Sequence, residues 1–233
     1  MKKFYLFLVA VMGMAVAAEA QSVSFGPRIG VNFATVRAVE GDDDFREEFN
    51  DEMEFSTGAQ FGAVVNFGIS DVFSIQPEVL YSQRGFEANT SLLEDDPMGD
   101  ISVKFKMNYL EVPVLAKISF GGDKVQGFVT AGPTVSYWMN GKLKTSFAGE
   151  KEEEDIEFQD DYEDGAKQNR LDFGASVGVG MAYRLGAGAL NLDVRYGHGL
   201  SDMTKYEEDR PSEEPKNAHR TIGVSLAYLF GGK

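Results

Sequence analysis

Apolar residues alternate with small or polar residues throughout residues 169–200, and this period of two limits the fold more than any other feature of the sequence. Odd positions in residues 171–183 are all apolar, while the even positions carry Asp, Gly, Ser and Ala. After the small-residue turn 186–188, the pattern resumes in residues 190–196. Successive side chains of a β-strand point to opposite faces. The stretch therefore predicts a β-hairpin with one apolar face, a pattern that soluble sandwiches and membrane barrels share.

The same period recurs along the chain and predicts eight strands. The connection at residues 69–71 is far too short for a crossover, so the strands on either side of it must be antiparallel. Pro27 lies near the start of the first predicted strand, where a missing N–H is tolerable. The predicted strands are residues 23–36, 55–67, 73–86, 102–120, 125–139, 171–184, 190–196 and 220–230.

The acidic residues lie between the predicted strands. Residues 37–54, 87–100, 141–168 and 201–218 hold 30 of the 37 Asp and Glu residues, so the charge falls at the ends of strands. These segments are polar and lack apolar periodicity, which predicts loops. The net charge of −15 argues against nucleic acid as a partner, because binding phosphates requires a basic surface.

The two faces of the strands favour a barrel over a sandwich. One face mixes charges of both signs with Gly, Ser, Asn and Gln, whereas the other is almost free of charge. An apolar stretch of about ten residues per strand suits a tilted membrane strand. Long loops alternating with short turns are also typical of outer-membrane barrels. We therefore expect an all-β, eight-stranded antiparallel up-and-down transmembrane β-barrel with four long acidic extracellular loops and periplasmic termini.

The interior of an eight-stranded barrel is just wide enough for its inward side chains to fill. Charges buried there must be paired or hydrated. We therefore expect a packed interior network with a structural role and no pore. Its predicted members are Arg28, Glu78, Arg84, Glu111, Lys117, Asp172, Arg184, Asp193 and Arg195.

The N-terminal residues predict export. A basic start, an apolar stretch and Ala18-Glu19-Ala20 are typical of a signal peptide over residues 1–20, which leaves residues 21–233 as the barrel domain. The chain has no cysteine, so we expect neither an acyl anchor nor a disulfide. No later run of 18 apolar residues predicts a transmembrane helix.

Three smaller features carry structural predictions. Lys104 and Lys106 interrupt the apolar pattern, which indicates either a bulge or a strand top that projects beyond the apolar band. The glycines at positions 174, 178 and 180 lie within a strand, and we expect them to permit close packing under large interior side chains. Aromatic residues near strand ends form interfacial girdles where they face outward. They are Tyr81, Tyr109, Tyr137, Trp138, Tyr183, Tyr196, Tyr228 and Phe230.

Four segments, residues 24–32, 77–85, 109–117 and 193–200, resemble the PorT-type outer-membrane β-barrel family, common in the Gram-negative Bacteroidetes. The resemblance covers essentially the whole mature chain and implies an eight-stranded outer-membrane barrel. It also implies a possible association with a type IX secretion machine, as for the founding member. The chain departs from the usual outer-membrane pattern because Phe230 is followed by Gly231, Gly232 and Lys233.

The sequence contains little that indicates catalysis. His198 and His219, with Ser201 and Asp202, suit a barrel-wall lipid or peptide hydrolase only weakly, since no second motif supports them. The acidic segments lack the EF-hand spacing, so we expect weak attraction of divalent cations and no specific calcium site. We expect no catalytic, cofactor-binding or metal site.

Three functional hypotheses follow from these patterns. The first is a non-enzymatic envelope component or loop-mediated binding protein, in contact with outer-membrane lipid and lipopolysaccharide. The second is an accessory subunit of a secretion machine, with envelope or secretion-system proteins as partners. The third is the barrel-wall hydrolase.

Overall fold

The computed structural model describes residues 21–40, 43–90, 101–147, 150–158, 166–206 and 216–231. The predicted signal peptide, residues 1–20, lies outside the described residues, as do the last two residues of the chain.

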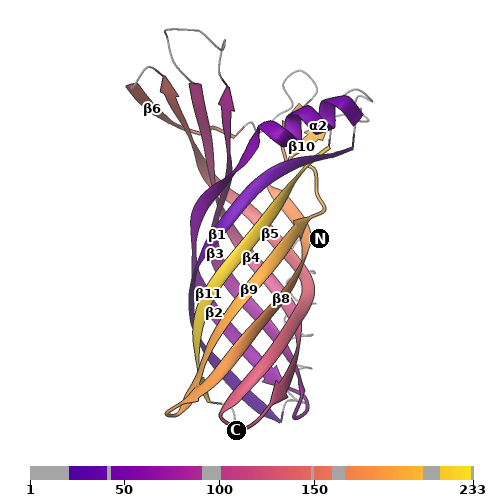
Figure 1. Cartoon of the computed structure of the whole chain (residues 1–233), viewed down its shortest axis with the longest axis vertical. Coiled ribbons are helices and arrows are strands. Elements are labelled where there is room, and N and C mark those ends of the chain that lie inside the picture. The colour runs from indigo at the N-terminus through magenta and orange to yellow at the C-terminus, as the bar shows by residue number, and fades with distance from the viewer. Residues whose placement is uncertain are drawn as a thin grey trace.

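Eight long antiparallel strands form a closed barrel, which confirms the predicted fold (Figure 1). Each strand pairs with its neighbours along the chain, and β1 pairs with β11 to close the ring. A membrane barrel must close in this way because hydrocarbon offers no partner for an unpaired backbone group. The strands are β1 (Ser22–Glu40), β2 (Met53–Gly68), β3 (Phe73–Thr90), β4 (Ile101–Gly121), β5 (Val125–Phe147), β8 (Leu171–Leu185), β9 (Gly188–Gly199) and β11 (Lys216–Gly231).

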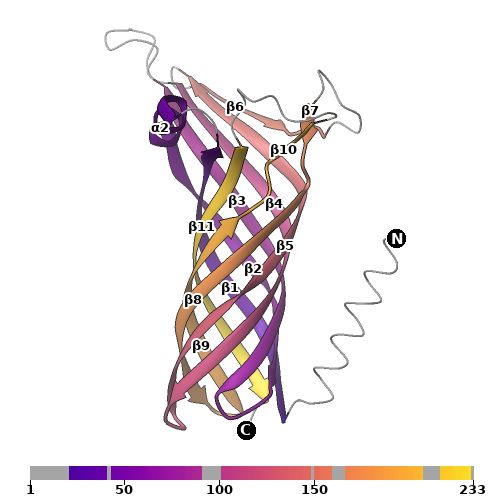
Figure 2. The ribbon, with the colours of Figure 1, turned by 90° about the vertical axis from the view of Figure 1, so that its right-hand side faces the viewer.

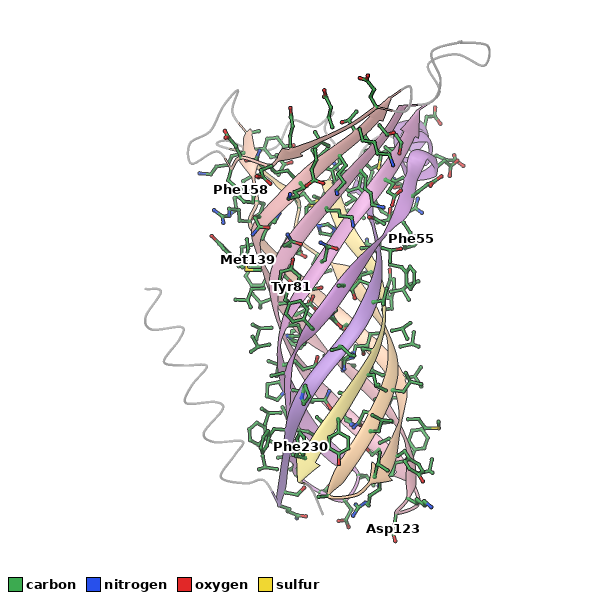
Figure 3. All side chains as sticks on the ribbon, turned by 90° about the vertical axis from the view of Figure 1, so that its left-hand side faces the viewer. Phe55, Tyr81, Asp123, Met139, Phe158 and Phe230 are labelled. Atoms are coloured by element: carbon green, nitrogen blue, oxygen red, sulfur yellow. The ribbon has the colours of Figure 1, made fainter. Side chains whose placement is uncertain are left out.

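The hairpin predicted from residues 169–200 corresponds to β8 and β9, which pair from Gly174 opposite Gly199 to Leu185 opposite Gly188. Gly186 in the turn has a φ of 62°, a conformation that glycine adopts without strain. The apolar, odd-numbered residues of β8 face outward, since Val177 and Val179 are 53% and 59% exposed. Figure 3 shows such side chains around the barrel wall.

Several strands are much longer than a membrane crossing requires. A tilted membrane strand needs about 9–11 residues, whereas β4 has 21 and β5 has 23. The upper ends of β3, β4 and β5 continue past the rest of the barrel as a sheet, seen at the top of Figures 1 and 2. Lys104 and Lys106 lie in this projecting part of β4. A bulge also occurs where β4 shifts register against β5, between Asn108 and Tyr109.

The acidic segments contain more regular structure than the sequence predicts. The described parts include helix α2 (Asp43–Glu52) and the short strands β6 (Glu150–Asp155), β7 (Ala166–Gln168) and β10 (Thr204–Tyr206). All four lie at the end of the barrel where the sheet projects. The prediction of plain loops is therefore wrong for these residues.

Local contacts explain helix α2. Asp43 and Asp44 occupy the first turn, where negative charge interacts favourably with the helix dipole. Arg46 forms an ion pair with Asp43 at 3.2 Å. The Asn50 side chain accepts a hydrogen bond from the Ala38 amide at 2.9 Å and donates one to the Ala38 carbonyl at 3.2 Å, so it joins α2 to β1.

Charge pairing explains β6. It pairs with β5 so that Glu153 lies opposite Lys144 and Asp155 lies opposite Lys142. Lys142 and Lys144 both donate to the Glu153 carboxylate. These hydrogen bonds lower the pKa of Glu153 to about 2. Opposite charges on neighbouring strands stabilise a sheet, and β6 forms although its side chains are exposed.

Acid should loosen the β5–β6 pair. The pKa of Glu153 is lower in the folded sheet than its ordinary value of 4.5, so its stabilising contribution is complete above about pH 4.5 and is lost as pH falls towards 2. We expect amide hydrogen exchange of Leu143 and Glu154 to quicken over that window once intrinsic pH effects are removed. The Glu153→Gln variant should lose this acid-dependent rise in exchange rate, and the Glu152→Gln variant should retain it. An identical pH profile in wild type and Glu153→Gln would contradict the assignment.

Candidate functional site

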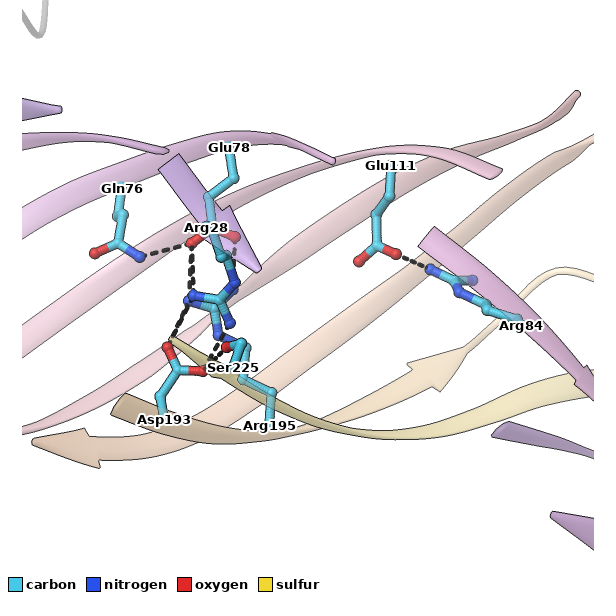
Figure 4. A network of polar contacts seen from close by, with 8 residues as sticks. All are labelled: Arg28, Gln76, Glu78, Arg84, Glu111, Asp193, Arg195 and Ser225. Carbon is cyan, nitrogen blue, oxygen red and sulfur yellow. Dashed lines mark hydrogen bonds and ion pairs between the residues drawn. The ribbon is translucent and has the colours of Figure 1, made fainter. Parts of the chain in front are cut away.

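The centre of the barrel holds a network of four charged side chains (Figure 4). Arg28, from β1, donates two hydrogen bonds to Asp193, on β9, at 2.7 and 2.8 Å. Arg195 donates two to Glu78, on β3, at 2.7 and 2.8 Å, and contacts Asp193 at 3.3 Å. All four residues are buried. The network thus joins strands that are not neighbours in the wall, across the lumen.

Neutral side chains complete this central network. Gln76 donates to Glu78 at 2.6 Å, and Ser225 donates to Asp193 at 2.7 Å. Gln76 is two residues from Glu78 on β3, and Ser225 lies opposite Asp193 in the register of β11 and β9, so both side chains face the lumen. Alternation in the sequence therefore predicts that they face inward, but the identity of each partner depends on the register of the strands.

A second charged cluster lies nearer the projecting sheet. Arg84 forms ion pairs with Glu111 and with Asp172, the latter at 3.1 Å, and donates to Ser136 at 3.1 Å. The Arg84 guanidinium also lies 5.0 Å from the centre of the Tyr109 ring. A buried arginine is stabilised by carboxylates and an aromatic face together.

Aromatic residues pack in the lumen beside this cluster. The Tyr109 hydroxyl and His219 Nε2 are hydrogen-bonded at 2.9 Å, and both residues are buried. Trp138 stacks on Tyr109 with ring centres 6.1 Å apart. Phe158 packs edge-on against Trp138. Tyr109 and Trp138 therefore belong to an interior plug and not to an aromatic girdle.

Other aromatic residues from the predicted set do face outward. Tyr137, Tyr183, Tyr196 and Phe230 are each at least 41% exposed. Phe230 is labelled near the lower end of the barrel in Figure 3. These residues occupy positions suited to interfacial girdles.

The described part of the barrel contains a small and a larger cavity. A small one of about 40 Å³ lies between the two charged clusters, lined by residues including Arg28, Arg84 and His219. It has room for a few water molecules. A larger one of about 690 Å³ lies at the end with the short turns and is lined by residues including Ser74, Lys117 and Asp123. We call this larger cavity the vestibule. The interior is thus packed in its middle and hollow at one end.

Glycines on β8 make the packed middle possible. A β-carbon at Gly178 would lie 2.7 Å from Arg195 Cγ, and one at Gly180 would lie 2.4 Å from Phe128 Cζ. Both distances are shorter than van der Waals contact. Glycine at these positions therefore makes room for large interior side chains, as the sequence predicts.

Eight of the nine residues predicted for the interior network are buried. Arg184 differs from the others because it is exposed near the end of β8, just before the turn at Gly186, where it lines the vestibule. Alternation alone does not show where the packed interior ends, so it does not distinguish Arg184 from the eight buried residues. Lys117 is buried in the lumen and donates to Asn191 at 3.1 Å.

The hydrolase hypothesis gains no geometric support. His219 is buried inside the wall, whereas His198 is exposed and 3.4 Å from the Tyr196 hydroxyl on the outer face. The two imidazole rings therefore have different partners on opposite faces of the wall, although both residues line the small cavity. Ser201 Oγ accepts a hydrogen bond from the Phe173 amide at 2.8 Å. A nucleophile would need a base within hydrogen-bonding distance.

Within the described ranges, no group of three or more His, Cys, Asp or Glu residues is arranged to hold a metal ion. In the same ranges, no helix is both long and apolar enough to cross a membrane.

Breaking the central network should destabilise the barrel. Asp193→Asn removes the charge that Arg28 and Arg195 share, and loss of one partner of a buried ion pair costs about 3–5 kcal/mol. We expect a lower urea midpoint for unfolding in lipid vesicles, measured by the gel mobility of unheated samples. Asp123→Asn, on an exposed turn, is the control with the same change of charge. Equal midpoints for Asp193→Asn and wild type would contradict a structural role for the network.

Comparisons with known proteins agree with this architecture. The model of the outer membrane protein beta-barrel domain family matches residues 19–205. Among curated proteins, no match was found.

Solved structures with a similar course of chain include small outer-membrane proteins. Ail of Yersinia pestis is 13% identical with a TM-score of 0.40, and the match covers 89% of this chain and 98% of that protein. Neisserial surface protein A is 13% identical with a TM-score of 0.43, and the match covers 89% of this chain and 97% of that protein. The outer membrane protease OmpT of Escherichia coli is 9% identical with a TM-score of 0.49, and the match covers 91% of this chain and 97% of that protein. At these scores the likeness carries no argument about function. The family match spans most of the chain, and this protein therefore belongs to the outer membrane protein beta-barrel domain family and resides in the outer membrane.

Proposed function

We propose that this protein is a non-enzymatic component of the outer membrane that binds partners through the sheet projecting from its extracellular end. The observation that carries the proposal is the buried cluster that joins that sheet to the interior plug. Met107, Tyr109 and Trp138 form a buried cluster against which Phe86 and Phe105 pack. A projection anchored by such packing can hold a binding surface in a fixed shape.

The closed lumen argues against a role as a channel. The central network, the Arg84 cluster and the Tyr109–His219 pair lie one above another along the interior. Side chains fill the interior of most eight-stranded barrels, whereas wider barrels leave an aqueous channel. A lumen packed in its middle, without a pore, therefore accords better with binding than with transport.

The charge of the projecting sheet favours a basic partner. Five of the six residues of β6 are acidic, and all six are exposed. Glu150, Glu152 and Glu154 share one face of the strand, opposite the face that contacts Lys142 and Lys144. Their carboxylates favour a basic polypeptide segment, and weakly favour divalent cations, while they repel nucleic acid.

The outer face above the apolar band favours contact with lipopolysaccharide. In the register of β4 and β5, Lys104 lies opposite Lys144 and Lys106 lies opposite Lys142. These lysines lie beyond the apolar band, separated from exposed Leu110 and Tyr137 by the Asn108–Asn140 pair. Ammonium groups at this height suit the phosphates of lipid headgroups, although Glu87 and Glu153 neutralise part of the charge.

Membership of the PorT-type branch would make a secretion-machine role the second candidate. It rests on the resemblance of four sequence segments and awaits a partner. Recovery of a stable complex from solubilised outer membranes would favour it, and repeated recovery of the barrel alone would count against it.

Binding of a basic strand by β6 can be measured directly. A synthetic peptide of alternating lysine and threonine should bind the protein in nanodiscs, with an affinity that falls as salt rises. The triple variant with Glu150, Glu152 and Glu154 each changed to Gln should bind at least five-fold more weakly. Changing Asp43 and Asp44 to Asn and Glu47 to Gln on α2 removes the same charge elsewhere and should leave binding unchanged. Equal loss in both triple variants would reduce the effect to general electrostatics and refute the proposed surface.

A further inference from the structure

The vestibule contains a cation whose surroundings differ from those of the other interior cations. Arg28, Arg84 and Arg195 each form an ion pair with at least one carboxylate. Among the described residues, Lys117 forms no ion pair within 4.0 Å, although it is 5% exposed. Its ammonium donates to Asn191 and lies 4.0 Å from the centre of the Phe128 ring.

Among the buried charges described in this half of the barrel, the charge of Lys117 is in excess. Arg28 and Arg195 are matched by Glu78 and Asp193 in the central network. Lys117 adds one positive charge beside them without adding a carboxylate. A lysine ammonium has three donors, and Asn191 accepts one of them. A buried charge is costly unless it is paired, so this position favours an anion.

The vestibule has the size and lining of a small-molecule site. Its volume of about 690 Å³ is within the range of about 300–1,000 Å³ found for ligand pockets. The wall next to Lys117 is polar: Ser74 lies opposite it in the register of β3 and β4, and Ser119 and Gln126 also line the cavity. Hydroxyl and amide groups there can hydrogen-bond a polar ligand.

The rim of the vestibule restricts the charge of that ligand. Asp71 and Asp123 on the short turns and Arg184 at the end of β8 line the cavity and are exposed. The two carboxylates outnumber the one guanidinium, so the rim attracts an ammonium group. One cation deep in the cavity and carboxylates at its rim therefore match a ligand with one carboxylate at one end and an amine at the other.

We propose that the vestibule binds the carboxylate of a short peptide from the periplasm at the Lys117 ammonium, with the peptide's amino end towards Asp71 and Asp123. The ligand can be a free peptide or the end of a longer chain, since both present the same carboxylate. This site lies at the opposite end of the barrel from the extracellular sheet and does not depend on the function proposed for that sheet.

The test uses the full barrel in nanodiscs, with NMR signals of the Lys117 side chain as the reporter. Triglycine should shift these signals and saturate, whereas triglycinamide, which lacks the carboxylate, should bind at least ten-fold more weakly. Acetate tests whether a carboxylate alone suffices, and weak binding that shifts the same signals supports the site. A longer peptide ending in triglycine should bind as well as triglycine if a chain end is accommodated, whereas its exclusion restricts the proposal to free peptides.

Variants separate a specific site from general charge attraction. Lys117→Met should abolish triglycine binding, read from the signals of Ser74 and Ser119. Lys124→Met removes the same charge from an exposed turn at the same end, where the ammonium lies 5.7 Å from the Tyr183 ring, and should bind normally. If Lys117→Met fails to fold, Ser74→Ala should weaken binding in a folded barrel, and the comparison of triglycine with its amide in wild type remains decisive. Equal binding of triglycine and triglycinamide, tighter binding of inorganic phosphate, or no binding of triglycine would overturn the proposal.

Discussion

The closed ladder of backbone hydrogen bonds is the constraint on which the rest of this structure depends. In hydrocarbon an unpaired amide or carbonyl costs several kcal/mol, so β1 and β11, the first and last strands, must meet. They do so from Ser24 opposite Gly231 to Glu40 opposite Lys216. Closure fixes one face of every strand towards lipid and the other towards the lumen. The period of two in the sequence is the direct result.

Closure also forces charged residues together. Inward positions must be filled by side chains that need not meet lipid, and in the middle of this barrel they are arginines and carboxylates. Their pairing crosses the lumen, from β1 to β9 and from β9 to β3. The ion pairs that satisfy the buried charges therefore also fill the middle of the lumen. Towards the short turns the inward residues become Ser, Gly and Asn, and the lumen opens into the vestibule.

Alternation made the eight strands and most of the interior predictable. It did not reveal α2 or β6, because these elements depend on contacts that only the folded chain makes, such as the hydrogen bond of Asn50 with Ala38 and the ion pair of Glu153 with Lys144. The Tyr109–His219 pair joins residues 110 positions apart, and only the register of the barrel brings them into contact. Alternation did not distinguish the exposed Arg184 from the buried residues, because it continues to the end of a strand whether or not the interior there is packed.

The pairing of β1 with β11 is the central claim, and disulfide crosslinking in native outer membranes tests it most directly. The chain contains no cysteine, so two introduced thiols react without competition. Val31 lies opposite Val224 across the seam, and Leu226 lies opposite Ile29. The account predicts rapid crosslinking of the Val31→Cys, Val224→Cys double variant, and little crosslinking when Leu226→Cys replaces Val224→Cys. Failure of the first pair to crosslink in folded protein, or equal crosslinking of both pairs, would contradict the closed barrel described here.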